Sequence, residues 1–368
     1  MSTRLAVLFG GVSVEHEVSI ITALSLMKEA QKKYQVLPIY VDKTGQWWTG
    51  DVLFDSSYFK TANLSAPKDL TPFTLSPNPK DNDLDAAILC FHGRFGEGGG
   101  VQGLLELAQI PYQGPNMTSA GLCFDKIHTR QVLAAENIPQ PEFLWFTYND
   151  WQTKESEIVE RIEAQLNWPV FVKPAGGGST VGVTRADDKK GLKKAIETAL
   201  QYDNRILVEQ AINDCLEINV AILGMDGSVT TSVPEQPIKA DEWLSYADKY
   251  ERGGGKKTGM ASAKRRIPAP ISEETTAKVQ QLARDVFRVL GCSGVVRVDC
   301  FVNPSTDEMF VIEPNTIPGS MSYYLFEASG LKYSELIDRL ISIAESKERL
   351  EKRLIHSYQS NILEKNGE

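Results

Sequence analysis

The sequence lacks the features that mark membrane, secreted and nucleic-acid-binding proteins. No apolar run approaches the roughly 18 residues of a membrane-spanning helix, and no basic and apolar leader precedes the first strand-like segment. The 39 basic residues are outnumbered by 48 acidic ones, which argues against a nucleic-acid or anionic-membrane surface. Five cysteines without metal-type spacing indicate reduced thiols. We therefore expect a cytoplasmic protein that binds neither nucleic acid nor membrane.

The first 120 residues alternate between short apolar strands and helices. Strands are expected at residues 5–9, 34–41 and 85–91, and helices at 15–32 and 101–108. This order predicts a parallel α/β sheet with covering helices. Residues 1–120 are accordingly expected to form a first domain.

The remaining residues predict two further α/β units and a tail. The units are expected at 121–206 and 207–347, and a polar tail at 348–368. A long charged loop at 238–268 interrupts the last unit, and a loop of this length is typical of a lid or of disorder. Within these units strands are expected at 143–146, 169–173, 206–209, 217–223 and 229–233, and helices at 119–136, 151–166, 189–201, 273–290 and 333–344.

A strand pair near the C-terminus predicts a magnesium site. Side chains alternate faces along a strand, so Arg297 and Asp299 share one face, as Glu313 and Asn315 do. An odd-numbered loop such as residues 304–308 would set Asp299 opposite Glu313. Two carboxylates and one amide beside a guanidinium suit Mg²⁺ that carries phosphates. The alternative is a half-buried hairpin whose polar face is merely solvated.

A glycine-rich loop predicts a phosphate contact. Lys173 ends a strand, residues 176–178 are glycines, and Ser179 follows them. Glycines let the backbone approach a phosphate while Ser179 and loop N–H groups donate to it. Lys126 on the preceding helix could supply a second positive charge. A ligand-free glycine hairpin and a solvated Lys126 are the alternatives.

Other candidate contacts lie at the ends of strands and helices. Glu209 could bind a ribose hydroxyl or an adenine amine, and Ile212 could pack on the base. Glu15 lies at a helix N-terminus after a glycine turn, where it either caps the helix or receives a substrate ammonium. His92 opens a glycine-rich strand-to-helix crossover, the position where doubly wound sheets bind ligands.

Taken in chain order, these motifs resemble those of the D-alanine:D-alanine ligases of the ATP-grasp superfamily, over roughly residues 4–345. The resemblance implies α/β architecture of three ATP-grasp domains, with a Rossmann-like parallel sheet first and ATP between two antiparallel sheets. The motifs that carry it are Gly10-Gly11 with Ser13 and Glu15, His92-Gly93 with Gly96-Glu97, Lys126, Lys173 with Gly178-Ser179, Glu209, Lys249-Tyr250, Arg297 with Asp299, and Glu313 and Asn315 with Pro318-Gly319.

The family resemblance also implies an activity and its partners. ATP would phosphorylate the carboxylate of one D-alanine, and the amine of a second would attack the D-alanyl phosphate for peptidoglycan precursor synthesis. The resemblance gives two Mg²⁺ or Mn²⁺ ions, D-alanine and ATP as substrates, and a homodimer. It places the metal on Asp299, Glu313 and Asn315.

The family pattern assigns roles to the remaining residues by position. Arg297 and the Gly319 N–H would receive the oxyanion, and Glu15 would hold the first ammonium through Ser179 and Tyr250. His92 would lie near the first carboxylate. The nucleotide would contact Lys126, Lys173, Ser179, Glu209, Ile212, Glu217 and Lys249, and the second substrate would contact Tyr324 and Leu325.

Three departures from the family pattern leave the acceptor open. Gly98 replaces an acidic residue, and residues 253–264 are unusually basic and glycine-rich. By an ungapped count, Tyr324 stands where the family has a serine for the acceptor carboxylate. A ligase for a different dipeptide or acceptor is therefore an alternative. A more distant one is a non-catalytic ATP-binding regulatory protein, which would not need Arg297.

Overall fold

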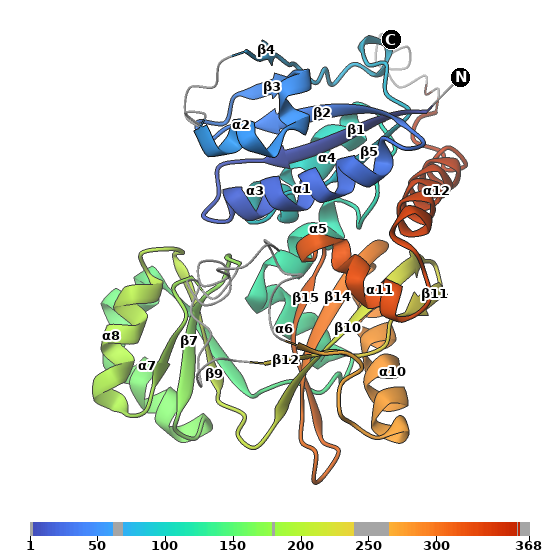
Figure 1. Ribbon diagram of the computed structural model, residues 1–368. Helices are drawn as coiled ribbons and strands as arrows, with labels where there is room; N and C mark the ends of the chain where they lie inside the picture. Colours follow the sequence, from blue (N-terminus) through green and yellow to red (C-terminus); the bar gives the residue numbers. More distant parts are fainter. Residues whose placement is uncertain (1–2, 62–68, 179–180, 239–264, 359, 361–368) are drawn as a thin grey trace.

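The computed structural model describes residues 3–61, 69–178, 181–238, 265–358 and 360. Within them, no helix combines the length and apolarity needed to cross a bilayer. The chain forms three main sheets, and each is covered by helices (Figure 1). The domain limits predicted above stay a prediction, because the sheets alone do not set where one unit ends.

The first sheet has the strand order β4-β3-β2-β1-β5. Its centre is parallel, as predicted, with β1 paired to β2 on one side and to β5 on the other. The sequence analysis missed an antiparallel edge formed by β3 and β4. The strands are β1 (Arg4–Gly10), β2 (Gln35–Val41), β3 (Trp47–Thr49), β4 (Thr71–Pro72) and β5 (Ala86–Leu89).

Helices from both ends of the chain cover this first sheet (Figure 1). Leu325 of α11 and Leu336 and Leu340 of α12 are fully buried in the same core as β1. The last helices therefore return to the beginning of the chain. The helices of this region are α1 (His16–Ala30), η1 (Asp51–Phe54), α2 (Ser56–Thr61), η2 (Pro79–Asp81), α3 (Arg94–Glu97), α4 (Gly100–Leu107), η4 (Gly319–Ser322), α11 (Tyr323–Ala328) and α12 (Tyr333–Glu351).

The second sheet is antiparallel throughout, in the order β6-β9-β7-β8. Two amphipathic helices, α7 and α8, bury Ile162 and Ile196 against it. Its elements are β6 (Phe143–Thr147), α7 (Tyr148–Gln165), β7 (Val170–Pro174), β8 (Thr184–Ala186), α8 (Lys189–Ala199) and β9 (Arg205–Gln210).

The third sheet has the order β11-β10-β14-β15 and is also antiparallel. Helix α10 packs Val279, Ala283 and Val286 on one face, which leaves the other face toward the second sheet. A short ribbon of β12 and β13 lies beside it. These elements are β10 (Leu216–Met225), β11 (Ser228–Thr231), β12 (Gln236–Pro237), β13 (Arg265–Arg266), α10 (Glu273–Val289), β14 (Gly294–Val302) and β15 (Met309–Asn315).

The prediction of one helix over residues 119–136 was wrong. The segment forms α5 (Met117–Phe124) and α6 (Lys126–Ala135), separated by an extended Asp125. The Asp125 carboxylate accepts from the His128 N–H at 3.0 Å and so caps α6. The break places Lys126 at the first position of a helix, where its backbone N–H donates to the Ala175 carbonyl at 2.9 Å.

Candidate active site

The β14–β15 hairpin brings the predicted metal ligands together. Asp299 lies opposite Glu313, and Arg297 lies opposite Asn315, as the hairpin hypothesis required. The odd-numbered loop was wrong, because residues 303–308 connect the paired Val302 and Met309. A β-bulge at Ile312 adds one residue to β15 and restores the register. The predicted side-chain set therefore depends on this bulge.

Arg297 and Asp299 form a buried bidentate ion pair. Both bonds measure 2.6 Å, and the Asn315 amide donates to the second Asp299 oxygen at 3.0 Å. Burial raises the pKa of Asp299 to about 6 against the opposing effect of Arg297, and Glu313 adds to the rise. Burial alone would lower the pKa of Arg297, but Asp299 raises it well above its usual range. Burial of Asp299 thus outweighs the stabilising effect of the guanidinium on its ionised form.

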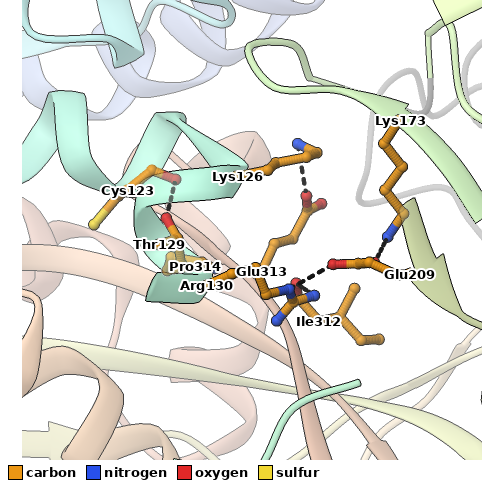
Figure 2. A pocket seen from close by; sticks show the side chains of 9 residues that line it. All are labelled: Cys123, Lys126, Thr129, Arg130, Lys173, Glu209, Ile312, Glu313 and Pro314. Atoms are coloured by element: carbon orange, nitrogen blue, oxygen red, sulfur yellow. Dashed lines mark hydrogen bonds and ion pairs between the residues drawn. The ribbon is translucent and has the colours of Figure 1, made fainter. Parts of the chain in front are cut away.

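Lys126 joins the glycine loop to the hairpin (Figure 2). Its ammonium lies 3.3 Å from a Glu313 carboxylate oxygen and donates to the Gly177 carbonyl at 2.8 Å. The Glu313 side chain is 35% exposed, so this acid remains open to solvent while Asp299 is buried. Lys126 therefore contacts both the glycine loop and the β14–β15 hairpin.

A second ion cluster lies across the same pocket (Figure 2). Glu209 binds Arg130 at 2.5 Å through one oxygen and Lys173 through the other. Arg130 also donates to the carbonyls of Val311 and Ile312 at 2.7 and 2.8 Å. Burial would raise the pKa of Glu209, but the two cations outweigh it and lower the pKa to about 2. Glu209 thus holds Lys173 in place.

Arg130 was missed in the sequence analysis, although it lies one helical turn after Lys126 on α6. Its side chain is only 3% exposed, and it connects α6, β9 and the bulge of β15. The spacing of four residues from Lys126 places both cations on the same face of one helix. That spacing could have identified Arg130 as a candidate from the sequence, but it does not indicate which residues Arg130 binds.

Glu15 faces the glycine loop between β7 and β8. It is 4% exposed, and a side chain at Gly178 would place its Cβ 2.2 Å from a Glu15 carboxylate oxygen. Only glycine permits this approach. Glu97, which belongs to the motif of His92-Gly93 and Gly96-Glu97, accepts from the Gly93 N–H at 2.7 Å, and burial together with Glu15 raises its pKa to about 8. Burial and the nearby Glu15 thus favour the protonated form of Glu97.

His92 lies near enough to Arg297 to sense its charge and is 6% exposed. Burial and the Arg297 charge lower its pKa to about 4, so the ring is neutral near pH 7. Its Nε2 lies 3.2 Å from the Thr22 hydroxyl, which also accepts from the Ser320 N–H at 3.3 Å. Thr22 therefore connects His92 to the turn that begins at Gly319.

That turn has an unusual backbone. Ser320, Met321 and Ser322 have φ values of 54°, 52° and 50°. Left-handed non-glycine residues cost about 1–3 kcal/mol each and concentrate at functional sites. The strain follows directly on Gly319, where the resemblance places the oxyanion donor.

The remaining predicted site residues differ in their location and burial. Glu217 lies on β10 and contributes to the raised pKa of Asp299, so it is near the metal set. Ile212 follows β9 and is half-buried. Leu325 is fully buried in the core, which leaves only its backbone for a substrate contact. Ser179, Lys249 and Tyr250 lie outside the described residues.

Tyr324 does not face solvent as a simple serine replacement would. Its hydroxyl donates to Glu235 at 3.0 Å, and Arg265 lies on its ring. Burial raises the pKa of the phenol above its usual value. Neither partner was expected from the sequence, because Glu235 and Arg265 lie far from Tyr324 in the chain.

The donor set fits a divalent ion. Among the described residues, no group of three or more His, Cys, Asp or Glu side chains is arranged to hold a metal. The predicted set has two carboxylates and the Asn315 amide, and Mg²⁺ is usually held by one or two carboxylates together with water and phosphate oxygens. The raised pKa of Asp299 indicates that more positive charge beside it would stabilise its ionised form.

Comparisons with known proteins agree on one family. A family model described as D-ala D-ala ligase N-terminus matches residues 4–115, and one described as D-ala D-ala ligase C-terminus matches residues 132–342. The D-alanine–D-alanine ligase of Caldicellulosiruptor bescii is 42% identical over 96% of this chain and 98% of its own. That of Clostridium acetobutylicum is 38% identical over 94% and 99%.

Solved structures of similar proteins cover nearly the whole chain. The VanG D-Ala:D-Ser ligase of Enterococcus faecalis is 30% identical, with a TM-score of 0.80 over 94% of this chain and all of its own. The D-alanine–D-alanine ligase of Coxiella burnetii is also 30% identical, with a TM-score of 0.78 over 95% and 97%.

Proposed function

Because the chain belongs to the D-alanine–D-alanine ligase family, we propose that it is an ATP-dependent ligase that joins two D-alanines for peptidoglycan precursor synthesis. The observation that carries this proposal is the set of charges on β14 and β15. Asp299, Glu313 and Asn315 converge beside Arg297, and nucleotide binding alone would not require that arginine.

In the first step, the γ-phosphoryl group of ATP passes to the carboxylate of one D-alanine, forming D-alanyl phosphate and ADP. Lys126 donates to the glycine loop and Lys173 is paired with Glu209, and both would hold the nucleotide phosphates. Catalysis of phosphoryl transfer consists mostly of positioning and charge stabilisation, which these cations supply. Glu217 and Ile212 are proposed to contact the nucleoside.

Asp299, Glu313 and Asn315 would hold one or two Mg²⁺ or Mn²⁺ ions. When bound, such ions neutralise charge that develops on the transferred phosphoryl group. Asp299 is fixed for this task by Arg297 and by the Asn315 amide. The number and identity of the ions belong to the proposal.

In the second step, the amine of the acceptor attacks the acyl carbon of D-alanyl phosphate and inorganic phosphate leaves. Arg297 and the Gly319 N–H are proposed to stabilise the oxyanion, a role in which one donor typically contributes about 10²-fold or more to the rate. Glu15 would bind the first ammonium, with Ser179 and Tyr250 completing that network. Lys249 is assigned to the nucleotide, and neutral His92 to the first carboxylate.

A second candidate keeps this chemistry but uses a different acceptor. Tyr324 replaces the serine of the family pattern and is bound to Glu235. The similarity to a D-Ala:D-Ser ligase points the same way, since that protein differs in its acceptor. The presence of Arg297 disfavours the non-catalytic alternative.

We also propose the cellular compartment and the oligomeric state of the enzyme. All five cysteines are free in the structure, which supports a reducing compartment such as the cytoplasm, where ATP is available. A homodimer is proposed from the family alone.

The test is phosphate release from ATP and Mg²⁺ with D-alanine, D-serine, D-lactate and L-amino acids, singly and in pairs, with products weighed by mass spectrometry. D-alanine alone should release one phosphate for each D-alanyl-D-alanine. A mixed pair as the only productive combination would reassign the acceptor. No phosphate release with any pair would contradict the ligase assignment.

A further inference from the structure

Tyr324 is held on two sides by one buried ion pair. Its hydroxyl donates to one Glu235 oxygen at 3.0 Å, and Arg265 binds the other Glu235 oxygen at 2.9 Å. The Arg265 guanidinium carbon lies 4.1 Å from the centre of the phenol ring. We call Glu235 and Arg265 the Tyr324 clamp.

The clamp fixes both the position and the tilt of the ring. The hydrogen bond to a carboxylate anchors the hydroxyl end, and the guanidinium covers one face through a cation–π contact. The Glu235 side chain is 2% exposed and that of Arg265 10%, so water screens these interactions weakly. A tyrosine held in this way is a rigid wall and not an adaptable side chain.

The clamp adjoins the reacting side of the hairpin. Glu235 exchanges two backbone hydrogen bonds of 2.9 Å with Asn219, and Asn219 lies opposite Asp299 in the sheet. Tyr324 itself is in the helix that follows the Gly319–Ser322 turn. The ring is therefore tied to both elements that frame Arg297.

The clamp also lies away from the nucleotide side. Helix α11 and the β6-β9-β7-β8 sheet lie on opposite sides of the β14–β15 hairpin in Figure 1. Lys173 and Glu209 belong to that sheet. The nucleotide phosphates are assigned to Lys126 and Lys173, and the first D-alanine to Glu15 and His92, so the acceptor is the ligand left for the Tyr324 side of Arg297.

We propose that Glu235 and Arg265 are positioning residues that fix Tyr324 as a wall of the acceptor subsite, and that this wall restricts the acceptor to D-amino acids with small side chains. The inference rests on the proposed function, because it presupposes ligation to an acceptor amine. A phenol ring occupies far more space than the serine of the family pattern, and a clamped ring cannot turn aside for a larger side chain. Glu235 and Arg265 therefore limit the size of the acceptor through Tyr324, without touching the acceptor themselves.

The experiment measures which dipeptide forms when acceptors compete. The enzyme is given ATP, Mg²⁺, D-alanine, D-2-aminobutyrate and D-valine at equal concentrations, and tandem mass spectrometry quantifies the dipeptides that begin with D-alanine. The ratio of products depends on acceptor choice and not on how much of a variant is folded. Kinetics in D-alanine then separate the KM of the acceptor from that of the donor and ATP.

One variant removes the Tyr324 ring, and the others weaken the contacts that hold it. Tyr324→Ala should raise the proportion of the larger dipeptides on the order of tenfold, since one methylene in a pocket changes discrimination by about 10- to 200-fold. Arg265→Lys and Glu235→Gln, which keep the ring but loosen it, should shift the ratio in the same direction by less, with the ATP KM unchanged. Tyr324→Phe tests the anchored hydroxyl alone.

Tyr323→Phe is the matched control. The Tyr323 ring stacks on Tyr333 with centres 4.3 Å apart and meets the Tyr324 ring edge-on at 6.2 Å. Tyr323→Phe keeps both ring contacts and changes only a hydroxyl outside the clamp. The ratio of dipeptides made by Tyr323→Phe should equal that made by the parent. An unchanged ratio in Arg265→Lys and Tyr324→Phe would overturn the inference, as would an equal shift in Tyr323→Phe. If the parent makes no dipeptide, the proposed function itself fails, which is a different result.

Discussion

Two buried ion clusters belong to the proposed site, and their charges balance differently. Glu209 is shared by Arg130 and Lys173, so one acid meets two cations. Asp299 has one arginine, and the further acid Glu313 lies opposite it. The pKa of Glu209 is lowered to about 2, whereas that of Asp299 is raised to about 6.

This difference separates two tasks. The Glu209 cluster has an excess of positive charge and connects α6 to β9, β7 and β15, so it suits nucleotide phosphates and also stabilises the fold. The Asp299 set brings the carboxylates of Asp299 and Glu313 together beside Arg297 and Lys126, so its oxygens suit added cations. The two clusters therefore suit ligands of opposite charge.

The largest effect should follow from Glu209→Gln. The substitution leaves Arg130 and Lys173 buried without their anion, and breaking a buried pair typically costs about 3–5 kcal/mol. Urea unfolding should show this loss in the free energy of unfolding. Asp307→Asn, at an exposed ion pair with Lys278, is the control and should change it by less than about 1 kcal/mol. Equal losses would show that the Glu209 cluster is not special.

The same cluster predicts a pH dependence. The folded pKa of Glu209, about 2, lies below its usual value of 4.5. Its contribution is therefore fully present above about pH 4.5 and is lost as the pH falls toward 2, with a total of roughly 3 kcal/mol. The stability difference between the parent and Glu209→Gln should stay constant from about pH 5 to 8 and shrink below about pH 4.5. A difference that grew on acidification would refute the assignment.

Arg297→Ala should act on the chemistry. We expect kcat to fall about 10²-fold or more, because the variant loses an oxyanion donor. Arg297→Lys, which keeps a charge but not the bidentate bond to Asp299, should recover part of the rate. Rapid-quench measurement of dipeptide formation, with Tm as a check on folding, provides the test. Full activity in Arg297→Ala would remove this residue from the mechanism.

The smallest of these effects concerns the metal set. Asn315→Ala removes one proposed ligand and the amide bond to Asp299, but leaves both carboxylates. The Mg²⁺ concentration for half-maximal activity should rise about tenfold, as for supporting groups at metal sites. Phosphate release across a magnesium titration after chelator treatment measures it. An unchanged titration curve would exclude Asn315 from the site.

The sequence predicted the parts of this site that depend on local pattern. Alternation along strands placed Arg297 with Asp299 and Glu313 with Asn315, and the structure confirms that pairing. The bulge at Ile312 was not predictable, because the loop lengths that fit the register with and without it differ by only one residue.

Long-range partners were also beyond the sequence. Arg130 and Glu209 are 79 residues apart, and Tyr324 and Glu235 are 89 apart. No periodicity links such positions, since only tertiary packing brings them together. The family resemblance supplied Glu209 and Tyr324 but neither Arg130 nor the clamp, because family motifs name ligand contacts and not the residues that hold them.

Nucleotide affinity in two variants tests most directly whether the Glu209 cluster and the Asp299 set have separate roles. Calorimetric titration with a non-hydrolysable ATP analogue in the absence of Mg²⁺ should show Arg297→Ala binding within about threefold of the parent, while Lys173→Met should lose about tenfold or more, because Lys173 and not Arg297 is proposed to contact the phosphates. If Arg297→Ala lost affinity as severely as it lost turnover, or if Lys173→Met bound normally, the two clusters would not have the separate roles assigned to them.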